Sequence, residues 1–284
     1  MSKTFVLINE NFVPAAEASI LINDLAIQRG YGIFDFLKLI DGKPVFLDDH
    51  LERFYNSASQ MRLNVEQNPE ALKTLLFSLI ERNKLDAPYT GIRMTLTGGY
   101  SNDGFSLSKP NLIIAQQAYS STREAANKGT SLVSYSHQRQ FAHVKTIDYL
   151  MAIWLKPYIG ENGADDVLYH QNGFVSECPR SNFFIVSSEG KLLTPGKNIL
   201  KGIIRKQLLS LNATSSYRVE EGDISLEEVY NAREVFITSS TKNIQPVIMV
   251  DGRLISNGQP GEITKSLQAQ LSQMIFQHVH SSQF

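Results

Sequence analysis

Two stretches of the chain carry side chains whose chemistry belongs together. Lys145 precedes an apolar segment that runs from Tyr149 to Leu155, and Glu177 stands just before a hydrophobic run that ends at Ile185. A lysine amine can capture an aldehyde as a Schiff base, and a carboxylate can keep a pyridine nitrogen protonated. A pyridoxal phosphate site requires both groups. Taken singly, each residue also fits a solvated surface position, so the rest of the chain must supply the other parts of such a site.

A phosphate cup is the next requirement, and three segments can contribute to it. Gly202 begins a predicted helix, where free backbone N–H groups and the helix dipole favour a dianion. The segment Thr238–Lys242 follows a predicted strand and offers hydroxyl groups, among them those of Ser240 and Thr241. Arg53 can add a bidentate guanidinium. Each piece is common turn or helix material by itself, and only their combination indicates a phosphate site.

Composition limits the class of protein. The 284 residues include 27 basic and 28 acidic side chains, so no electrostatic field favours nucleic acid or an anionic membrane. Six histidines are scattered without zinc-site spacing, and no metal site is predicted. The single cysteine, Cys178, fits a reducing compartment. The N-terminus lacks the layout of a signal peptide, and no apolar run approaches ~18 residues. We expect a soluble, cytoplasmic, globular protein that binds neither nucleic acid nor membrane.

Apolar patterning predicts a small N-terminal α+β domain over residues 1–118. Helices are expected near 50–61 and 69–84, and strands at 5–9, 12–13, 33–40, 91–97 and 111–115. Asp41-Gly42 predicts a type I′ turn into a strand at 44–47. Asp48 or Asp49 is expected to cap the helix that follows. A polar, glycine-rich loop over 98–110 has the length of loops that cover or enter a site.

Residues 119–128 are polar and rich in small side chains, which predicts a linker to a larger, strand-rich domain over 129–284. Asn172-Gly173 and Asp251-Gly252 are hairpin signals in this second domain. Its strands are expected at 167–170, 174–175, 183–186, 191–194 and 234–238, and its helices at 203–211, 225–230 and 263–276. The predicted fold class is therefore α+β in two domains.

In their order, these segments resemble the fold-type IV pyridoxal phosphate enzymes, or class IV aminotransferases. That family includes branched-chain and D-amino-acid aminotransferases and aminodeoxychorismate lyase. The matching motifs are Arg29-Gly-Tyr-Gly-Ile-Phe-Asp35, His50-Leu-Glu-Arg53, Lys145-Thr-Ile-Asp-Tyr-Leu150, Ser176-Glu-Cys-Pro-Arg-Ser-Asn-Phe183, Leu200-Lys-Gly-Ile-Ile-Arg205 and Phe236-Ile-Thr-Ser-Ser-Thr241. The resemblance spans nearly the whole chain. It implies two domains with the cofactor between them, in a homodimer whose neighbouring subunit's loop reaches the substrate.

The resemblance also implies roles for individual residues. Lys145 is implied as the catalytic Schiff-base lysine, and Glu177 as the partner of the ring nitrogen. Tyr149 falls where branched-chain enzymes place a tyrosine against the phenolic oxygen of the cofactor, although a core aromatic is the alternative. The residues implied for the phosphate are the Arg53 side chain, the main chain of Ile203 and Ile204, and the hydroxyl-bearing Ser240 and Thr241.

Departures from the family pattern leave the substrate open. The familiar D-amino-acid enzymes carry an Arg-x-His pair in the loop after residue 97, and Gly98–Gly104 has neither residue. Branched-chain enzymes carry Tyr-x-Arg at 91–93, of which this chain keeps only Arg93. Phe36 replaces a small residue near the substrate pocket. Cys178 replaces the usual glycine, as in some lyases, and is interpreted as a packed residue and not as a nucleophile.

Two arginines can replace the missing pair. A guanidinium holds an α-carboxylate bidentately. Arg29 lies at the mouth of the glycine loop, and Arg180 follows Glu177 by three residues. We hypothesise that they form a carboxylate trap suited to alanine, aspartate or glutamate, with Phe34 and Arg93 also on the substrate side. The alternative is that both arginines pair with surface acids.

The first functional prediction is a transaminase acting on amino acids and 2-oxo acids, with D-amino acids slightly favoured over L-branched-chain ones. A lyase that releases pyruvate from aminodeoxychorismate is the second class. The third class is a non-catalytic pyridoxal phosphate carrier, and the retention of both Lys145 and Glu177 argues against it.

Overall fold

A computed structural model describes residues 4–119, 129–211 and 217–281. The contacts within the chain divide it into two units. Unit 1 comprises Met1–Ser120, Val144–Asp148 and His278–Phe284, and unit 2 comprises Ser121–His143 and Tyr149–Gln277. The linker predicted at 119–128 lies outside the described residues except for its first position. The segment around Lys145 and the end of the last helix, which the sequence places in the second domain, group with unit 1.

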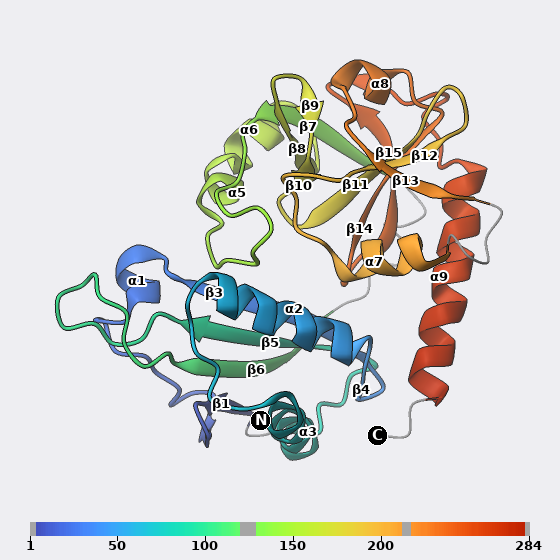
Figure 1. Cartoon of the computed structure of the whole chain (residues 1–284). Coiled ribbons are helices and arrows are strands. Elements are labelled where there is room, and N and C mark those ends of the chain that lie inside the picture. The colour runs from blue at the N-terminus through green and yellow to red at the C-terminus, as the bar shows by residue number, and fades with distance from the viewer. Residues whose placement is uncertain (1–3, 120–128, 212–216, 282–284) are drawn as a thin grey trace. The chain divides into compact units, whose positions relative to one another are not determined.

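Unit 1 is built on a six-stranded antiparallel sheet with the order β2-β1-β6-β5-β3-β4. Helix α2 runs along this sheet (Figure 1), and the core packs α2 and α3 against it through residues such as Leu37, Phe54 and Leu76. The strands are β1 (Phe5–Ile8), β2 (Asn11–Pro14), β3 (Gly32–Ile40), β4 (Lys43–Pro44), β5 (Tyr89–Thr97) and β6 (Leu112–Ala118). The helices are α1 (Leu25–Arg29), α2 (Leu47–Gln60) and α3 (Pro69–Asn83).

The start of α2 differs from the prediction. Strand β4 is shorter than expected, and α2 begins at Leu47 with Phe46 as its N-cap, at φ 55°. The expected cap by Asp48 or Asp49 is wrong, since no side chain caps this helix. The Phe46 N–H instead donates to His278 Nε2 at 3.0 Å, across 232 positions of the chain. A distant acceptor thus replaces the local one.

Unit 2 is built on a mixed sheet with the order β13-β12-β11-β14-β15-β7-β8-β9, while β10 pairs with β11 and β16 with β15. Its strands are β7 (Thr130–Ser136), β8 (Asp166–Gln171), β9 (Phe174–Val175), β10 (Glu177–Cys178), β11 (Ser181–Val186), β12 (Leu192–Pro195), β13 (Val219–Gly222), β14 (Glu234–Ser239), β15 (Asn243–Val250) and β16 (Arg253–Leu254). Its helices are α5 (Leu150–Trp154), α6 (Lys156–Glu161), α7 (Ile203–Ser210), α8 (Leu226–Tyr230) and α9 (Glu262–Ser281). The predicted α+β class is confirmed.

The turns of unit 2 follow the sequence signals. Asn172 and Gly173 have φ of 53° and 82°, and Asp251 and Gly252 have φ of 51° and 73°. Positive φ at both central residues is what a type I′ hairpin requires. These turns fix the registers of β8 with β9 and of β15 with β16.

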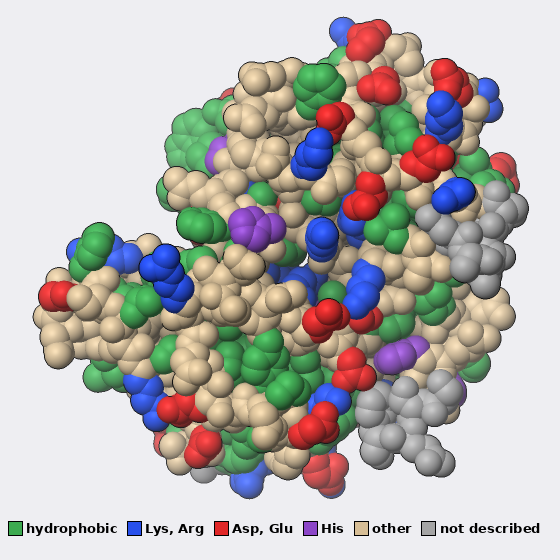
Figure 2. All heavy atoms as spheres, viewed as in Figure 1, with side chains coloured by type: hydrophobic (Ala, Val, Ile, Leu, Met, Phe, Trp, Pro, Cys, Tyr) green, Lys and Arg blue, Asp and Glu red, His purple; other side chains and the backbone are tan. Residues whose placement is uncertain are grey.

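The visible surface carries basic and acidic side chains interspersed with one another (Figure 2). This distribution matches the near balance of 27 basic and 28 acidic residues. Of the helices that the structure describes, none combines the length and the apolar character needed to cross a membrane.

Candidate active site

The backbone of Lys145 is fixed to β3 and α2 in unit 1. The Phe34 N–H donates to the Lys145 carbonyl at 2.9 Å, and the next residue, Thr146, pairs with Ile33 in an antiparallel bridge. The Lys145 N–H donates to Ser57 Oγ at 3.3 Å. These contacts hold the half-buried lysine beside the first half of β3.

The Phe34 ring gathers two of the predicted cations. Lys145 Nζ lies 4.6 Å from the ring centroid, and the guanidinium carbon of Arg93 lies 3.9 Å from the same centroid. Both distances are within the range of cation–π attraction. Unit 1 therefore brings together Lys145, Phe34 and Arg93, and their combined positive charge suits a carboxylate.

Arg53 is anchored by a buried carboxylate. Its Nε donates to Asp35 Oδ2 at 2.8 Å, and its Nη2 donates to Asp35 Oδ1 at 2.7 Å. His50 Nδ1 lies 2.7 Å from the same Oδ1. Burial raises the pKa of Asp35, but the charges and hydrogen bonds of Arg53 and His50 outweigh it and hold that pKa well below its usual range. The carboxylate is therefore ionised and fixes the guanidinium.

Helix α2 places His50, Arg53 and Ser57 on one side, because residues three, four and seven apart share a helix face. Burial lowers the pKa of His50, and the charges of Arg53 and Lys145 lower it further against the opposing effect of Asp35. His50 is thus neutral at physiological pH and lies within electrostatic range of both cations.

Glu177 lies in β10 of unit 2 and is 4 % exposed. Its Oε1 accepts from Arg139 Nη1 at 2.8 Å, and its Oε2 accepts from the Leu200 N–H at 3.0 Å. These donors compensate the carboxylate for its loss of water. A buried charge held in this way can accept a hydrogen bond from a protonated ring nitrogen.

Asn182 clamps the loop that leads into α7. Its Nδ2 donates to the Leu200 carbonyl at 2.7 Å, and its Oδ1 accepts from the Gly202 N–H at 3.1 Å. A Cβ atom on Gly202 would lie 2.1 Å from that Oδ1, so only glycine fits without a shift. Helix α7 then begins without a side-chain cap. The N–H groups of Ile203 and Ile204 therefore have no intrahelical acceptor and favour an anion.

The turn between β14 and β15 is the second predicted phosphate loop. Thr238 pairs with Asn182 across β11 and β14, so this turn begins beside the clamp on α7. Ser239 Oγ accepts from the Lys242 N–H at 3.1 Å and lies 3.4 Å from Thr241 Oγ1. Ser240 is half-buried and Thr241 is exposed. Unit 2 therefore brings both predicted phosphate loops together with Glu177.

Three further predicted residues lie apart from these contacts. Tyr149 is half-buried and directly precedes α5. Arg29 is exposed at the end of α1 in unit 1, and Arg180 is exposed in the turn between β10 and β11 in unit 2. Within the part of the chain that the structure describes, neither arginine forms an ion pair with an acidic side chain. Because they belong to different units, the carboxylate trap stays a prediction.

Cys178 is 1 % exposed and belongs to the core of unit 2. Burial raises the pKa of its thiol well above the usual value. A thiol in this state is a poor nucleophile. The environment agrees with the interpretation of Cys178 as a packed residue.

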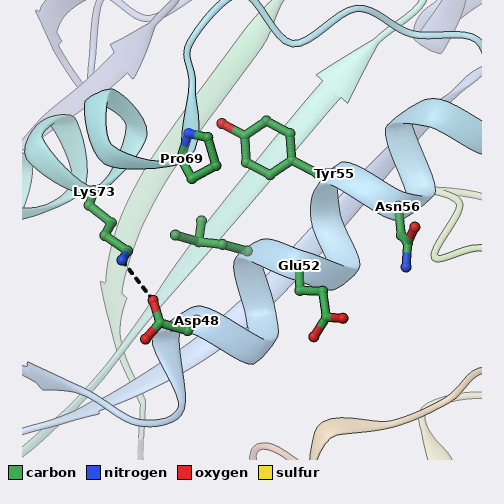
Figure 3. Close-up of a pocket in the computed structure, with 7 residues that line it drawn as sticks. Asp48, Glu52, Tyr55, Asn56, Pro69 and Lys73 are labelled. Carbon is green, nitrogen blue, oxygen red and sulfur yellow. Dashed lines mark ion pairs between the residues drawn. The ribbon is translucent and has the colours of Figure 1, made fainter.

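A hollow of about 430 Å³ between α2 and α3 is a separate feature of unit 1 (Figure 3). Asp48 and Tyr55 of α2 line it together with Lys73 of α3, whose Nζ lies 2.8 Å from Asp48 Oδ1. At 3.6 residues per turn, Asp48 and Tyr55 lie on the side of α2 opposite Arg53. This hollow therefore does not belong to the Lys145 site.

A second hollow, of about 620 Å³, lies in unit 1 beside the loop over 98–110. Its polar lining includes Arg29, Gln28 and Asp103. Arg29 Nη1 donates to the Gln28 carbonyl at 3.0 Å. The predicted loop thus borders a polar hollow that contains one of the predicted arginines.

Four residues of these constellations are absent from the site predicted from the sequence. They are Asp35, His50, Arg139 and Asn182. Asp35 carries a recognisable signal, since it is a charged residue in the row of β3 whose other members, Ile33, Leu37 and Leu39, are apolar. Arg139 carries none, because it lies 38 positions from Glu177 and only the folded chain joins them.

Comparison with known proteins identifies the family. The model of the family described as amino-transferase class IV matches residues 32–250. A D-alanine aminotransferase of Listeria monocytogenes is 28 % identical over 272 residues, which cover 92 % of this chain and 93 % of that protein. A Methanocaldococcus jannaschii protein, provisionally named a branched-chain-amino-acid aminotransferase, is 30 % identical over 273 residues, with 92 % and 93 % covered.

Solved structures share the fold. The branched-chain aminotransferase of Thermoproteus uzoniensis with norvaline superimposes with a TM-score of 0.86 at 24 % identity, covering 97 % of this chain and 96 % of that one. The branched-chain amino acid aminotransferase of Escherichia coli gives a TM-score of 0.85 at 24 % identity, with 96 % and 94 % covered. The fold is therefore that of the fold-type IV enzymes.

Class IV aminotransferases use pyridoxal 5′-phosphate. The donor groups here suit that cofactor, because the uncapped N–H groups at the start of α7 fit a phosphate and a buried carboxylate fits a protonated ring nitrogen. From the match over residues 32–250 and the two relatives that align along nearly their whole length, this chain belongs to the class IV aminotransferases.

Proposed function

We propose that the chain moves an amino group between an amino acid and a 2-oxo acid at Lys145, with D-amino acids slightly favoured as donors. The observation that carries this proposal is the environment of Glu177, a buried carboxylate that accepts from Arg139 and from the Leu200 N–H. Such a group can hold a proton on a ring nitrogen, which transamination chemistry needs.

In this proposal each residue has a defined role. Pyridoxal phosphate bound by the chain supplies an electron-withdrawing ring. Lys145 holds the cofactor covalently, and its amine moves the proton at the substrate α-carbon when substrate has displaced it. Tyr149 holds the phenolic oxygen of the cofactor. The phosphate is held by the Arg53 side chain, the N–H groups of Ile203 and Ile204, and the hydroxyls of Ser240 and Thr241.

The substrate carboxylate is proposed to bind to Arg29 and Arg180. Within the described residues neither arginine forms an ion pair with an acidic side chain. This supports the proposal, because the alternative role of the two arginines is to pair with surface acids. Phe34 and Arg93 are proposed to line the substrate side near Lys145, supported by the shared contact of Arg93 and Lys145 with the Phe34 ring.

Transfer from L-branched-chain amino acids is the second candidate. It is supported by the retention of Arg93 and by the name of the Methanocaldococcus jannaschii relative. A lyase acting on aminodeoxychorismate is the third, and Cys178 is the residue that this chain shares with some lyases. We also propose that the chain is cytoplasmic, in keeping with its single cysteine.

A panel of single D- and L-amino donors, each with a 2-oxo acid acceptor, tests the activity. D-alanine, D-aspartate and D-glutamate are expected to give a higher kcat/KM than L-leucine. The opposite order would favour the branched-chain assignment. Pyruvate release from aminodeoxychorismate without amino transfer would favour the lyase.

Lys145→Ala tests the covalent role independently of the substrate. The wild-type protein treated with borohydride is expected to keep its cofactor after denaturation, whereas the variant loses it. Retention by both proteins would place the attachment at another lysine.

Arg29→Ala and Arg180→Ala test the carboxylate trap. Each is expected to raise KM for every amino donor by about tenfold, as the loss of a charge-assisted hydrogen bond does. Arg253→Ala, at an exposed position of β16, is the control and is expected to leave KM unchanged. An unchanged KM in Arg180→Ala for all donors would show the trap to be wrong.

A further inference from the structure

We propose that Asp35 is a positioning residue for phosphate binding, which fixes the Arg53 guanidinium so that its remaining N–H groups meet the cofactor phosphate. This inference rests on the proposed role of Arg53 and deepens it. Asp35 itself would not touch the cofactor.

Burial of the Asp35 carboxylate in β3 opposes folding, and a positioning role would explain why an aspartate stands there. Alternation along β3 puts Asp35 in the same row as Ile33, Leu37 and Leu39, which are all in the core, and Asp35 is 0 % exposed. An ionised carboxylate taken out of water needs strong compensation. The donors that provide it are Arg53, His50 and the Phe36 N–H, the last at 2.8 Å.

The geometry of the Arg53 guanidinium determines which of its N–H groups remain available to a ligand. Asp35 occupies Nε and one hydrogen of Nη2, at 2.8 Å and 2.7 Å. Nη1 has no hydrogen-bond partner within the described part of the chain, and the Arg53 side chain is 12 % exposed. An arginine offers five N–H donors in a rigid fork. Its outer edge therefore stays available to a second oxyanion while Asp35 holds the inner edge.

A purely electrostatic role and a positioning role of Asp35 predict opposite effects on phosphate binding when the carboxylate is neutralised. If the carboxylate mattered only through its charge, neutralising it would strengthen binding of a phosphate dianion, since one nearby negative charge is lost. If it positions Arg53, neutralising it weakens phosphate binding, because the guanidinium then has to be ordered when the ligand binds. His50 is neutral and does not change this balance.

The experiment compares two ligands on the protein freed of its cofactor. Pyridoxal 5′-phosphate and pyridoxal differ in the phosphate, and both can form an imine with Lys145. In Asp35→Asn, the Kd of pyridoxal 5′-phosphate is expected to rise at least about tenfold while the Kd of pyridoxal stays unchanged. An unchanged or tighter Kd for pyridoxal 5′-phosphate overturns the proposal, and an equal rise for both ligands assigns Asp35 a general structural role.

Arg53→Lys keeps the charge but cannot form the two-point contact with Asp35, and it leaves the buried carboxylate in place. It is expected to lose the preference for pyridoxal 5′-phosphate over pyridoxal as completely as Arg53→Ala does. A wild-type preference in Arg53→Lys would overturn the proposal. If even Arg53→Ala keeps the preference, the proposed role of Arg53 fails as well, so the two failures are distinguishable.

Asp24→Asn is the matched control. Asp24 is also 0 % exposed in unit 1, but it accepts from the uncharged Thr97 Oγ1, Asn111 Nδ2 and Ala26 N–H. This variant is expected to lower the Tm and to leave the ratio of the two Kd values unchanged. The contrast with Asp35→Asn separates loss of a buried hydrogen-bond network from loss of positioning.

Discussion

At the scale of single residues, each unit contains a buried carboxylate that holds an arginine. Glu177 pairs with Arg139 in unit 2, and Asp35 pairs with Arg53 in unit 1. Such pairs contribute little net stability relative to apolar residues, but breaking one leaves an uncompensated charge. Their presence indicates a task other than stability, and Glu177 and Arg53 are the proposed contacts of the cofactor.

Arg139→Met is expected to lower the free energy of unfolding by about 3 kcal/mol, because it leaves the buried Glu177 carboxylate without its cation. Urea denaturation at pH 7 measures this change. Lys191→Met is the control, since Lys191 pairs with Glu189 at the surface, where water and salt screen the attraction. A loss for Arg139→Met as small as that for Lys191→Met would contradict the assigned environment of Glu177.

At the scale of elements, the start of α7 depends on a contact between β11 and the loop that precedes the helix. Asn182 fills the space in which a side chain at Gly202 would lie. A larger residue at position 202 must therefore displace Asn182 or the start of α7. Either shift would disturb the N–H groups of Ile203 and Ile204, which are proposed to bind the phosphate.

Gly202→Ala is expected to lower the free energy of unfolding by about 1–3 kcal/mol, as overpacking does, and to weaken binding of pyridoxal 5′-phosphate. Isothermal titration and urea denaturation measure the two effects. Gly160→Ala in α6 is the control, because nothing lies within 4 Å of the position that its methyl group would take and alanine favours a helix. Equal stability of the two variants would show that the contact with Asn182 is not restrictive.

Strand β3 also carries a buried lysine. Lys38 is 4 % exposed, and burial lowers its pKa from 10.5 to about 8. Below pH 8 the folded state holds a desolvated charge. Between pH 8 and 10.5 the unfolded chain binds a proton that the folded chain has lost, so Lys38 makes stability rise with pH in this window.

Lys38→Met is expected to raise the free energy of unfolding at pH 7 by up to about 3 kcal/mol, because it removes the charge and keeps most of the length of the side chain. The gain should shrink as the pH rises from 8 to 10.5. Chemical denaturation at about pH 7, 9 and 10.5 follows it, with the exposed Lys156→Met as the control. A gain that does not depend on pH would refute the assignment to charge burial.

At the scale of the whole molecule, exposed apolar side chains gather in one part of unit 1. Ile22, Ile27 and Phe105 are 84 %, 57 % and 83 % exposed. Asn23, Gln28 and Gly104, their neighbours in the sequence, line the same polar hollow, so the three apolar residues lie near one another beside it. Large exposed apolar groups that cluster indicate an interaction surface, and we propose that this one forms the contact of the homodimer that the family resemblance implies.

The wild-type protein is expected to sediment as a dimer of 31.8 kDa chains. Replacing Ile22 and Phe105 together by lysine should shift it toward the monomer, because two charges would have to be desolvated at the contact. Exchanging the exposed Leu254 and Phe276 for lysine is the control. A wild-type monomer at micromolar concentration would contradict the proposal.

Many of the strands, turns and site residues of this protein can be predicted from its sequence, because short local patterns of residues indicate them. A dense apolar run predicts β3, and Asn172-Gly173 predicts a hairpin, since both express the preferences of neighbouring residues. The six motifs that indicate the cofactor are each a few residues long, and their order along nearly the whole chain can be read before any contact is known.

Tertiary structure alone decides the contacts between distant segments. The start of α2 is set by His278, which lies 232 positions from Phe46, and not by the nearby Asp48 or Asp49. Glu177 and Gly202 likewise form hydrogen bonds with side chains that lie 38 and 20 positions away. Sequence periodicity carries no information about such pairs, because their energy arises only when folding brings the segments together.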